Sequence, residues 1–277
     1  MKRTFQIVLA VAWMLIPLLT QAQGNLIDAP LPHSKGQSVS PSFEGWYANP
    51  NGSFSLVFGY FNRNYEQDLS LSIGPNNQFE PGPADRGQPT YFHPRRHTGV
   101  FAVEVPADFG NQQLNWRLTA GGESIAIPGH LRPEWEITAL EEITSGNTPP
   151  VVKFSNNGNS AQGPLGVASP LITTRTGTTA ELTIWSSDDG VKKSRAAGQA
   201  ARTGLVLSKY RGPGDIEIED ATPRLVDGMA STTATFSEPG DYTLRVLAWD
   251  DSGGQGPIMA GGFFCCWTNA FIEVKVE

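Results

Sequence analysis

The densest group of side chains able to do chemistry is the seven-residue run Tyr91–His97, which holds two aromatic rings, two imidazoles and two arginines. Its guanidiniums are planar forks that pair with a carboxylate or phosphate through two parallel hydrogen bonds. Its rings offer flat faces on which a sugar or another flat ligand stacks. We therefore predict a ligand-binding site that also includes a later imidazole and consists of Tyr91, Phe92, His93, Arg95, Arg96, His97 and His130.

A structural role for the same run is the alternative. Surface arginines commonly pair with carboxylates of their own chain, and such pairs contribute little to stability. In this interpretation Arg95 and Arg96 meet acidic side chains of the protein, while Tyr91 and Phe92 hold the segment against a sheet. Both interpretations stay open at the level of the sequence.

A zinc site made of three histidines needs imidazoles that converge on one point. His93 and His97 are four residues apart, a spacing that brings side chains together on a helix. Pro94 lies between them and disfavours a helix there. We therefore do not expect zinc to bind His93, His97 and His130.

Two acidic pairs, each followed closely by glycine, suggest a calcium site as one interpretation. Calcium takes six to eight oxygen ligands, and clustered carboxylates beside permissive backbone supply them. Aspartates also form ordinary turns, because their side chains bond their own backbone. Both interpretations stay open, and calcium is the cofactor to expect if these residues bind metal: Asp188, Asp189, Asp250 and Asp251.

Cys265 and Cys266 are the two cysteines of the chain, and they are adjacent. Neighbours in a strand point to opposite faces, so a disulfide between them needs a distorted peptide. The alternatives are a vicinal disulfide, an intermolecular bond, or buried thiols. We favour burial or a vicinal bridge over redox catalysis, because no basic residue nearby in sequence stabilises a thiolate.

The sequence holds neither a Gly-x-Ser-x-Gly motif nor a phosphate-binding glycine loop, so we assign no catalytic residue. Glu44, Glu134 and Glu136 remain open as a glycosidase pair brought together in space. Most tryptophans are expected in the core, because each ring buries a large apolar area. Any that stay exposed would form a carbohydrate-stacking surface.

The elements that must position these residues are short β-strands. Alternating residues after the turn Asn49–Gly52 predict a strand over 53–62, and we expect regular structure to begin near Phe43. The four prolines within 74–94 predict a long loop without regular structure. Runs bounded by Gly, Pro or Asn predict the other strands, at 68–73, 99–105, 114–119, 123–128, from 151, and at 178–185, 232–236, 242–249 and 271–276.

Four motifs of the second half resemble successive strands of a PKD or cadherin-like domain: Thr148–Val151, Ala180–Gly190, Phe236–Val246 with its Pro-Gly-Asp-Tyr turn, and Ala248–Gly253. The resemblance implies an immunoglobulin-like sandwich over about 148–277, with Tyr242 as the tyrosine of a corner. Segments 191–224 and 253–262 depart from the pattern as insertions. The first half, with its motifs over 43–47 and 58–64, resembles uncharacterised secreted bacterial proteins, which implies no activity.

The N-terminus has the pattern of a signal peptide. Lys2 and Arg3 precede an apolar run over 7–19, and Thr20-Gln21-Ala22 offers small residues for cleavage. This apolar run is shorter than the roughly 20 residues that span a bilayer, so we expect no membrane insertion. Removal of Lys2 and Arg3 takes the net charge from −7 to −7 − 2 = −9, which makes nucleic acid a poor partner.

These patterns together predict an all-β protein of two tandem β-sandwich domains, the second PKD/immunoglobulin-like, after a cleaved signal peptide. The predicted parts are a signal peptide (1–22), a flexible leader (23–42), a first sandwich (43–140), a linker (141–150) and a second sandwich (151–277).

Export and the lack of a catalytic set favour a secreted or periplasmic, non-enzymatic binding or adhesion protein. Its expected partner is an extracellular protein or a polysaccharide. Two alternatives stay open: a secreted enzyme that acts on glycans near 91–97, and a structural subunit of an extracellular assembly, for which a homo-oligomer is expected.

Export predicts a mature chain that begins at Gln23, because the cleavage motif ends at Ala22. Intact mass spectrometry of the protein recovered outside the cytoplasm of a bacterial host checks this. Recovery of the chain with Met1 still attached, in the cytoplasm alone, would contradict the prediction.

Overall fold

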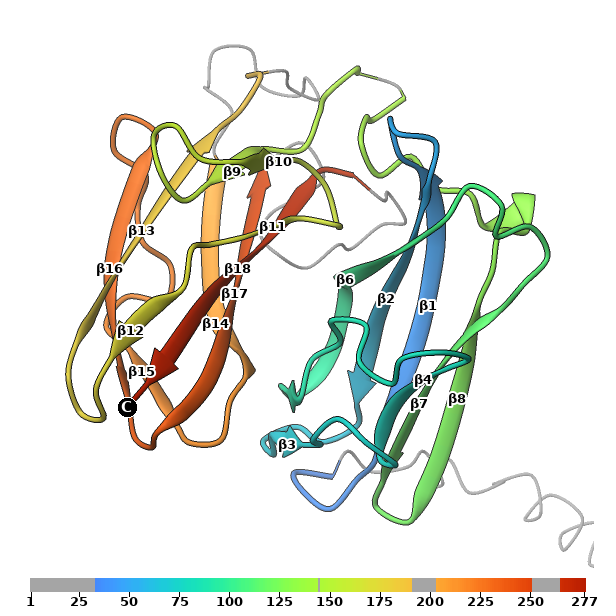
Figure 1. Ribbon diagram of the computed structural model, residues 1–277, viewed down its shortest axis with the longest axis horizontal. Helices are drawn as coiled ribbons and strands as arrows, with labels where there is room; N and C mark the ends of the chain where they lie inside the picture. The colour runs from blue at the N-terminus through green and yellow to red at the C-terminus, as the bar shows by residue number, and fades with distance from the viewer. Residues whose placement is uncertain (1–32, 144, 191–202, 251–264) are drawn as a thin grey trace, which may run out of the picture. The chain divides into compact units, whose positions relative to one another are not determined.

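The computed structural model describes residues 33–143, 145–190, 203–250 and 265–277, which Figure 1 shows in colour. Regular structure in these ranges consists of strands, apart from the single 3-10 turn η2 (Pro133–Trp135). The prediction of an all-β fold is therefore confirmed. No helix in the described ranges is long and apolar enough to cross a membrane.

Three antiparallel sheets form in the first half of the chain. One has the order β1-β2-β6, one has the order β4-β7-β8, and β3 pairs with β5. The strands are β1 (Val39–Ala48), β2 (Phe54–Asn62), β3 (Leu69–Ser70), β4 (Asn77–Glu80), β5 (Tyr91–Phe92), β6 (Arg95–Val105), β7 (Leu114–Ala120) and β8 (Glu123–Gly129).

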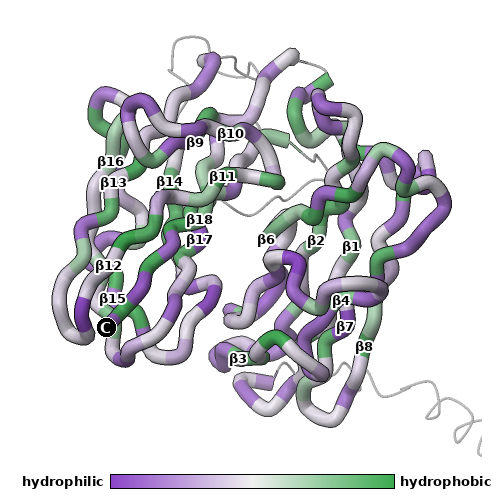
Figure 2. Tube along the Cα trace, in the orientation of Figure 1, coloured by the Kyte–Doolittle hydropathy of each residue, from purple (hydrophilic) through white to green (hydrophobic). Residues whose placement is uncertain are grey.

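Aromatic rings fill the core between the two three-stranded sheets. Phe58 of β2 and Phe101 of β6 stack with their ring centroids 5.5 Å apart, and Phe79 of β4 and Trp116 of β7 stack at 5.9 Å. Phe58 and Phe79 meet edge to face at 5.3 Å. β7 alternates buried with half-buried residues, so one of its faces enters this core, whereas β2 is buried along almost its whole length. Figure 2 shows hydrophobic and hydrophilic residues mixed along the chain by colour.

Two boundaries in this half differ from the sequence prediction. β1 begins at Val39 rather than near Phe43, because it is an edge strand, where Pro41 is tolerated. The prediction of an irregular loop over 74–94 is wrong for β4, which pairs with β7. Pro75 and Pro81 flank β4 and leave the N–H groups of the strand itself intact.

Two five-stranded sheets form in the second half. One has the order β10-β9-β13-β16-β15, and the other joins β11, β18, β17 and β14, with β12 also paired to β18. The strands are β9 (Val151–Lys153), β10 (Ser160–Ala161), β11 (Val167–Ala168), β12 (Ile172–Thr174), β13 (Ala180–Ser187), β14 (Thr203–Arg211), β15 (Ile216–Ile218), β16 (Met229–Phe236), β17 (Gly240–Asp250) and β18 (Trp267–Val276).

These two sheets have the strand order of an immunoglobulin-type sandwich. When β9 and β13 to β18 are lettered A to G, one sheet reads A-B-E-D and the other G-F-C. Their inward residues, such as Leu182 and Phe236 from one sheet and Leu244 and Ile272 from the other, form one buried cluster. The prediction of an immunoglobulin-like sandwich in this half is therefore confirmed.

The region predicted as a polar insertion, 191–224, contains β14 and β15, so that prediction is wrong for both strands. β14 pairs with β17 along most of its length, and Leu205 and Leu207 enter the core. The spacing of Leu205 and Leu207, two residues apart, is a strand signal that the polar composition of the surrounding segment obscured.

Tyr242 forms the predicted tyrosine corner at the start of β17. Its buried hydroxyl donates to the carbonyl of Glu238 at 2.8 Å and accepts from the N–H of Gly214 at 3.0 Å. Its ring packs against Phe236 at 4.9 Å. The corner therefore joins the turn before β17 to the connection between β14 and β15.

One core cluster comes mainly from residues before 141–150 and a second from residues after them, while a third, smaller cluster joins Tyr47, Val57 and Ala139 to Trp267. Tyr210 of β14 nevertheless packs in the first cluster, and the contacts of the chain group Ser34–Glu277 into one unit. The position of the domain boundary stays a prediction.

Replacement of Tyr242 by Phe should lower the free energy of unfolding by about 1–3 kcal/mol, because the buried N–H of Gly214 and the carbonyl of Glu238 lose their partner. The midpoint of urea unfolding measures the loss. Tyr65→Phe is the matched control, since Tyr65 is exposed and its ring contact with Arg95 is kept. Equal midpoints for the two variants would contradict the role of the corner.

Candidate functional site

Tyr91, Phe92 and His93 join the predicted binding segment to its surroundings. Tyr91 and Phe92 form β5, and the Phe92 ring is fully buried. The Nδ1 of His93 lies 3.1 Å from a carboxylate oxygen of Asp68, and its Nε2 lies 3.1 Å from the carbonyl of Lys209. The Nζ of Lys209 lies 4.3 Å from the centre of the Tyr91 ring. These three residues are therefore held by contacts within the chain.

The two arginines of the segment also meet groups of the protein itself. Arg95 has a φ of 73°, and its guanidinium stacks over the rings of Tyr65 at 3.8 Å and Phe61 at 5.0 Å. Arg96 donates to the buried carboxylate of Glu44 at 2.7 Å. The contacts match the structural interpretation of the segment, and ligand binding by it stays a prediction.

His97 and His130 contact different residues. His97 stacks on the ring of Tyr60 at 4.9 Å, and its Nε2 donates to the carbonyl of Pro94 at 3.0 Å. Burial lowers the pKa of His97 to about 4. His130 instead packs against the rings of Phe43 and Trp135. Among the described residues, no three His, Cys, Asp or Glu side chains are placed to hold a metal ion.

Glu44 is a buried carboxylate on β1 that is hydrogen-bonded to two residues of β6. One oxygen accepts from Arg96, and the other accepts from the N–H of Gly99 at 2.6 Å. Burial raises the pKa of Glu44 to about 7, against the opposing charge of Arg96. Glu134 and Glu136 are exposed, whereas both oxygens of Glu44 are hydrogen-bonded within the chain, and a glycosidase pair among these three residues stays a prediction.

The carbonyl of Gly99 accepts three donors from the last two strands of the chain. They are a guanidinium nitrogen of Arg245 at 3.1 Å, the indole N–H of Trp267 at 3.1 Å and the amide of Asn269 at 2.8 Å. Arg245 is 7% exposed and also donates twice to the side-chain oxygen of Asn269. Burial lowers the pKa of Arg245 to about 10, so the guanidinium stays charged at neutral pH.

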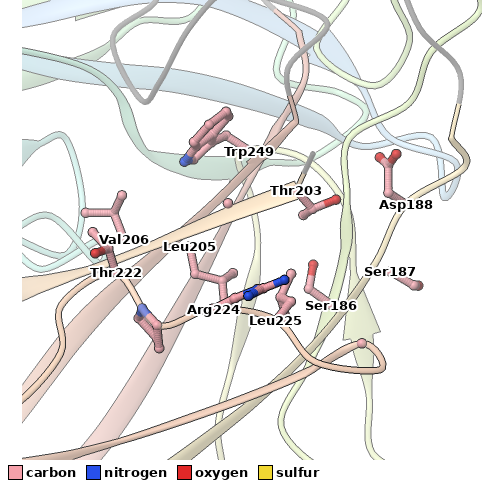
Figure 3. A pocket seen from close by; sticks show the side chains of 13 residues that line it. Ser186, Ser187, Asp188, Thr203, Leu205, Val206, Thr222, Arg224, Leu225 and Trp249 are labelled. Atoms are coloured by element: carbon pink, nitrogen blue, oxygen red, sulfur yellow. The ribbon is translucent and has the colours of Figure 1, made fainter. Parts of the chain in front are cut away.

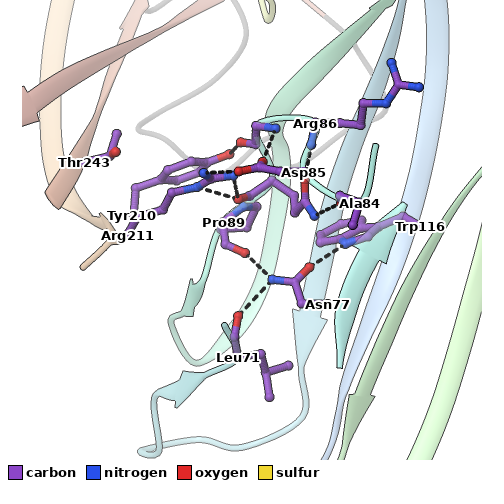
Figure 4. A network of polar contacts seen from close by, with 12 residues as sticks. Leu71, Asn77, Ala84, Asp85, Arg86, Pro89, Trp116, Tyr210, Arg211 and Thr243 are labelled. Carbon is purple, nitrogen blue, oxygen red and sulfur yellow. Dashed lines mark hydrogen bonds and ion pairs between the residues drawn. The ribbon is translucent and has the colours of Figure 1, made fainter. Parts of the chain in front are cut away.

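A buried amide organises the segment before β5. Asn77 donates to the carbonyls of Leu71 at 2.9 Å and Pro89 at 2.8 Å, and it accepts from the indole N–H of Trp116 at 3.0 Å (Figure 4). A buried amide with all of these partners fixes the path of the chain. The segment that carries the predicted site is therefore rigidly placed.

Arg211 of β14 clamps the same segment, as the dashed lines in Figure 4 show. Its guanidinium meets the carboxylate of Asp85 at 2.7 and 3.0 Å, and its Nε donates to the carbonyl of Gln88 at 2.8 Å. The hydroxyl of Tyr210 donates to the carbonyl of Gly87. The hydrogen bonds from Arg211 lower the pKa of Asp85. Arg211, Asp85 and Tyr210 therefore hold the segment before β5 in place.

The predicted calcium ligands lie in turns near the ends of β13 and β17. Asp188 accepts from the N–H of Gly190 at 3.0 Å, and Asp189 accepts from the N–H and hydroxyl of Thr148 at 2.9 and 2.8 Å. Asp250 accepts from the amide of Asn147 at 2.8 Å. Asp251 lies outside the described residues, and calcium binding stays a prediction.

Cys265 and Cys266 form a disulfide with each other, which selects the vicinal bridge among the alternatives. Both side chains are buried, and both sulfurs lie near the carbonyl of Asn147. The bridge directly precedes β18, the strand that supplies Trp267 and Asn269 to Gly99.

A cleft of about 820 Å³ lies beside β14, and we call it the β14 cleft. Its walls come from the end of β13, the start of β14, the end of β17 and the loop before β16, as Figure 3 shows. The volume falls in the range of small-molecule sites. The lining includes Ser186, Ser187, Asp188, Thr203, Gly204, Leu205, Val206, Thr222, Pro223, Arg224, Leu225, Gly228 and Trp249.

The β14 cleft holds polar groups that the described chain does not use. The exposed guanidinium of Arg224 has no hydrogen-bond or ion-pair partner among the described residues. The buried hydroxyl of Ser186 and the indole N–H of Trp249 also have none there. Buried polar groups without a partner, such as the Ser186 hydroxyl and the Trp249 N–H, are uncommon in folded proteins, and a ligand is one explanation for them. This contrasts with segment 91–97.

Comparison with known proteins finds no matching family model or curated protein for this chain, and it finds distant structural likenesses. Among solved structures, domains 4 and 5 of the S-layer protein SbsC align over 87% of this chain and 98% of their own, with 11% identity and a TM-score of 0.24. Titin domains Z1Z2, solved in complex with telethonin, align over 86% and 96%, with 11% identity and a TM-score of 0.23. At these TM-scores neither likeness supports an argument.

Sequence reasoning missed the β14 cleft because it treated 191–224 as an insertion. Leu205 and Val206 lie on a strand that alternation could have revealed. No local pattern marks Arg224 as unpaired, since pairing depends on which carboxylates the fold brings near.

The opposite pKa shifts of Glu44 and His97 predict a specific dependence of stability on pH. The raised pKa of Glu44 gives a stabilising contribution that is present below pH 4.5 and lost as pH rises through 7. The lowered pKa of His97 gives one that is present above pH 6.5 and lost as pH falls through 4. The two contributions oppose each other between these limits.

The variant Glu44→Gln keeps only the His97 contribution, so its urea midpoint should rise more steeply than that of the wild type as pH increases from about 4.5 to 6.5. A titration of the imidazole by NMR is an independent measurement that needs no variant. Titration of His97 near its ordinary value of 6.5 would contradict the burial effect.

Proposed function

We propose that this chain is a non-enzymatic binding protein that works outside the cytoplasm and holds a glycan in the β14 cleft. The proposed ligand is a short glycan that ends in a carboxylate-bearing sugar. The observation that carries the proposal is the guanidinium of Arg224, which lies on the lining of a cleft of about 820 Å³ and has no partner among the described residues.

The charge of Arg224 supports a carboxylate in the ligand. Arg224 has no acidic partner among the described residues, and its planar fork matches a carboxylate through two hydrogen bonds. The negative protein repels long polyanions, but a single carboxylate feels little of this repulsion, because salt screens charges beyond about 8 Å.

The remaining lining supports a sugar body. Leu205, Val206 and Leu225 give apolar surface, and Trp249 gives an aromatic ring with an unpartnered N–H. Hydroxyl groups of Ser186, Thr203 and Thr222 add small polar contacts. A few polar groups on a largely apolar wall are typical of small-molecule sites.

The state of segment 91–97 favours a binding protein over the enzyme alternative. A general base works best with a pKa near the operating pH, whereas burial holds the pKa of His97 at about 4 and its Nε2 is bonded to Pro94. The guanidinium of Arg96 and the carboxylate of Glu44 satisfy each other. The groups needed for catalysis at this segment are therefore already engaged.

The leader pattern of residues 1–22 supports a secreted or periplasmic location. The motifs of the second half, from Thr148 to Gly253, support a relation to PKD or cadherin-like domains as part of this proposal. Modules with this architecture carry many different functions, so the ligand is argued from the cleft and not from the architecture.

Replacement of Arg224 by Gln should weaken binding of a glucuronate-terminated oligosaccharide by about tenfold or more, because the charged pair is lost. Isothermal titration calorimetry measures the affinity. Arg175→Gln is the matched control, since it makes the same charge change at an exposed residue outside the cleft. The same oligosaccharide with a glucose end should bind the wild type as weakly as the acidic one binds the variant.

Three results would overturn this proposal. They are the absence of binding to the wild type, equal loss in Arg175→Gln and Arg224→Gln, and equal affinity for the acidic and neutral oligosaccharides. Turnover of the glycan during the titration, detected by mass spectrometry, would replace the binding protein by the enzyme alternative.

A further inference from the structure

A second cavity, of about 450 Å³, lies between the turn after β1 and the segment around β10 and β11, and we call it the Glu104 cavity. It shares no lining residue with the β14 cleft. The hydroxyl of Tyr47 accepts the N–H of Leu165 at 3.2 Å, which joins its two walls. The side chains that the argument uses are Tyr47, Asn51, Leu140, Gln162, Leu165 and Glu104 itself.

The hairpin between β1 and β2 holds the carboxylate of Glu104. Glu104 lies on β6 directly opposite Ser55 of β2. Its Oε1 accepts from the amide of Asn51 at 3.0 Å and from the hydroxyl of Ser53. These two hydrogen bonds lower the pKa of Glu104, so the carboxylate is charged at neutral pH. Its position is fixed without an arginine or lysine.

The polar groups left over at this cavity are mainly acceptors. The Oε2 of Glu104 makes no hydrogen bond within the described chain. The amide nitrogen of Gln162 donates to the carbonyl of Pro149 at 2.8 Å, whereas its oxygen has no partner among the described residues. The amide of Asn51 is already used on Glu104. A matching ligand therefore donates hydrogen bonds to Glu104 and Gln162, while the Ser160 hydroxyl on the same lining can donate or accept.

The charge of the cavity lining indicates which hydrogen-bond donor a ligand would carry. Glu104 is the one charged side chain among the described lining residues. An ammonium group donates up to three hydrogen bonds and complements a carboxylate that has no counter-ion. Leu140, Leu165 and the ring of Tyr47 line the rest of the cavity and favour an apolar or ring-shaped body next to the ammonium.

We propose that the Glu104 cavity binds a small molecule with a primary ammonium group on a compact apolar or sugar-ring body, with Glu104 as its counter-ion. Gln162 accepts a further hydrogen bond from the ligand. The cavity has the volume of a small-ligand site. This site is independent of the glycan proposed for the β14 cleft, because the two use different residues and opposite charges.

Isothermal titration calorimetry of the full mature chain with cadaverine and with glucosamine tests the proposal. Each amine is paired with a neutral analogue, 1-pentanol or glucose. At least one amine should bind about tenfold or more tightly than its analogue, because only the amine pairs with the carboxylate. The tighter of the two amines identifies an aliphatic or a sugar body.

The variant Glu104→Gln should lose this preference, with amine affinity reduced about tenfold or more. Glu217→Gln is the matched control, since Glu217 is exposed on β15 and outside the cavity. If Glu104→Gln does not fold, Glu104→Asp and Gln162→Ala serve instead. The first should keep the preference for the amine, and the second should weaken binding severalfold.

Equal binding of amine and neutral analogue, or unchanged amine affinity in Glu104→Gln or Gln162→Ala, would overturn the proposal. So would a complete absence of amine binding to the wild type. Binding of the amine in Arg224→Gln should equal that of the wild type, which separates the failure of this site from failure of the β14 cleft.

Discussion

The peptide unit of Gly99 is the point on which much of the polar interior depends. Its carbonyl accepts Arg245, Trp267 and Asn269, and its N–H donates to Glu44. A buried guanidinium is costly unless it is hydrogen-bonded to several partners. The Gly99 carbonyl and the Asn269 oxygen provide these partners for Arg245. Strands that are far apart in the sequence are thereby bound to one peptide.

A bulge makes this peptide accessible. Between Phe101 and His97 β6 advances four residues, while its partner β2 advances two, from Phe58 to Tyr60. The extra residues lift Gly99 out of the ladder, with a φ of 55° that favours glycine. A Cβ atom at Gly99 would lie 2.2 Å from the Trp267 ring. The conformation and the space therefore both require glycine here.

The hydrogen bonds around Gly99 explain why segment 91–97 differs from the β14 cleft and the Glu104 cavity. Glu44 must be held beside Gly99, and Arg96 provides its counter-charge, so the 91–97 segment is drawn into the internal network. The β14 cleft and the Glu104 cavity lie outside that network. Arg224 and the Oε2 of Glu104 therefore have no partner within the described chain, whereas Arg95 and Arg96 contact groups of the protein itself.

The sequence by itself determined the all-β class, most strands and the tyrosine corner of Tyr242, because period-two burial and turn chemistry are local properties. It also raised the alternative that Arg96 is used within the chain. Only the tertiary structure decided that Glu44 is the partner, that Cys265 joins Cys266, and that Arg224 has no partner among the described residues. Pairing and cavities depend on contacts between distant segments, such as the 146 residues that separate Gly99 from Arg245, and no local pattern encodes them.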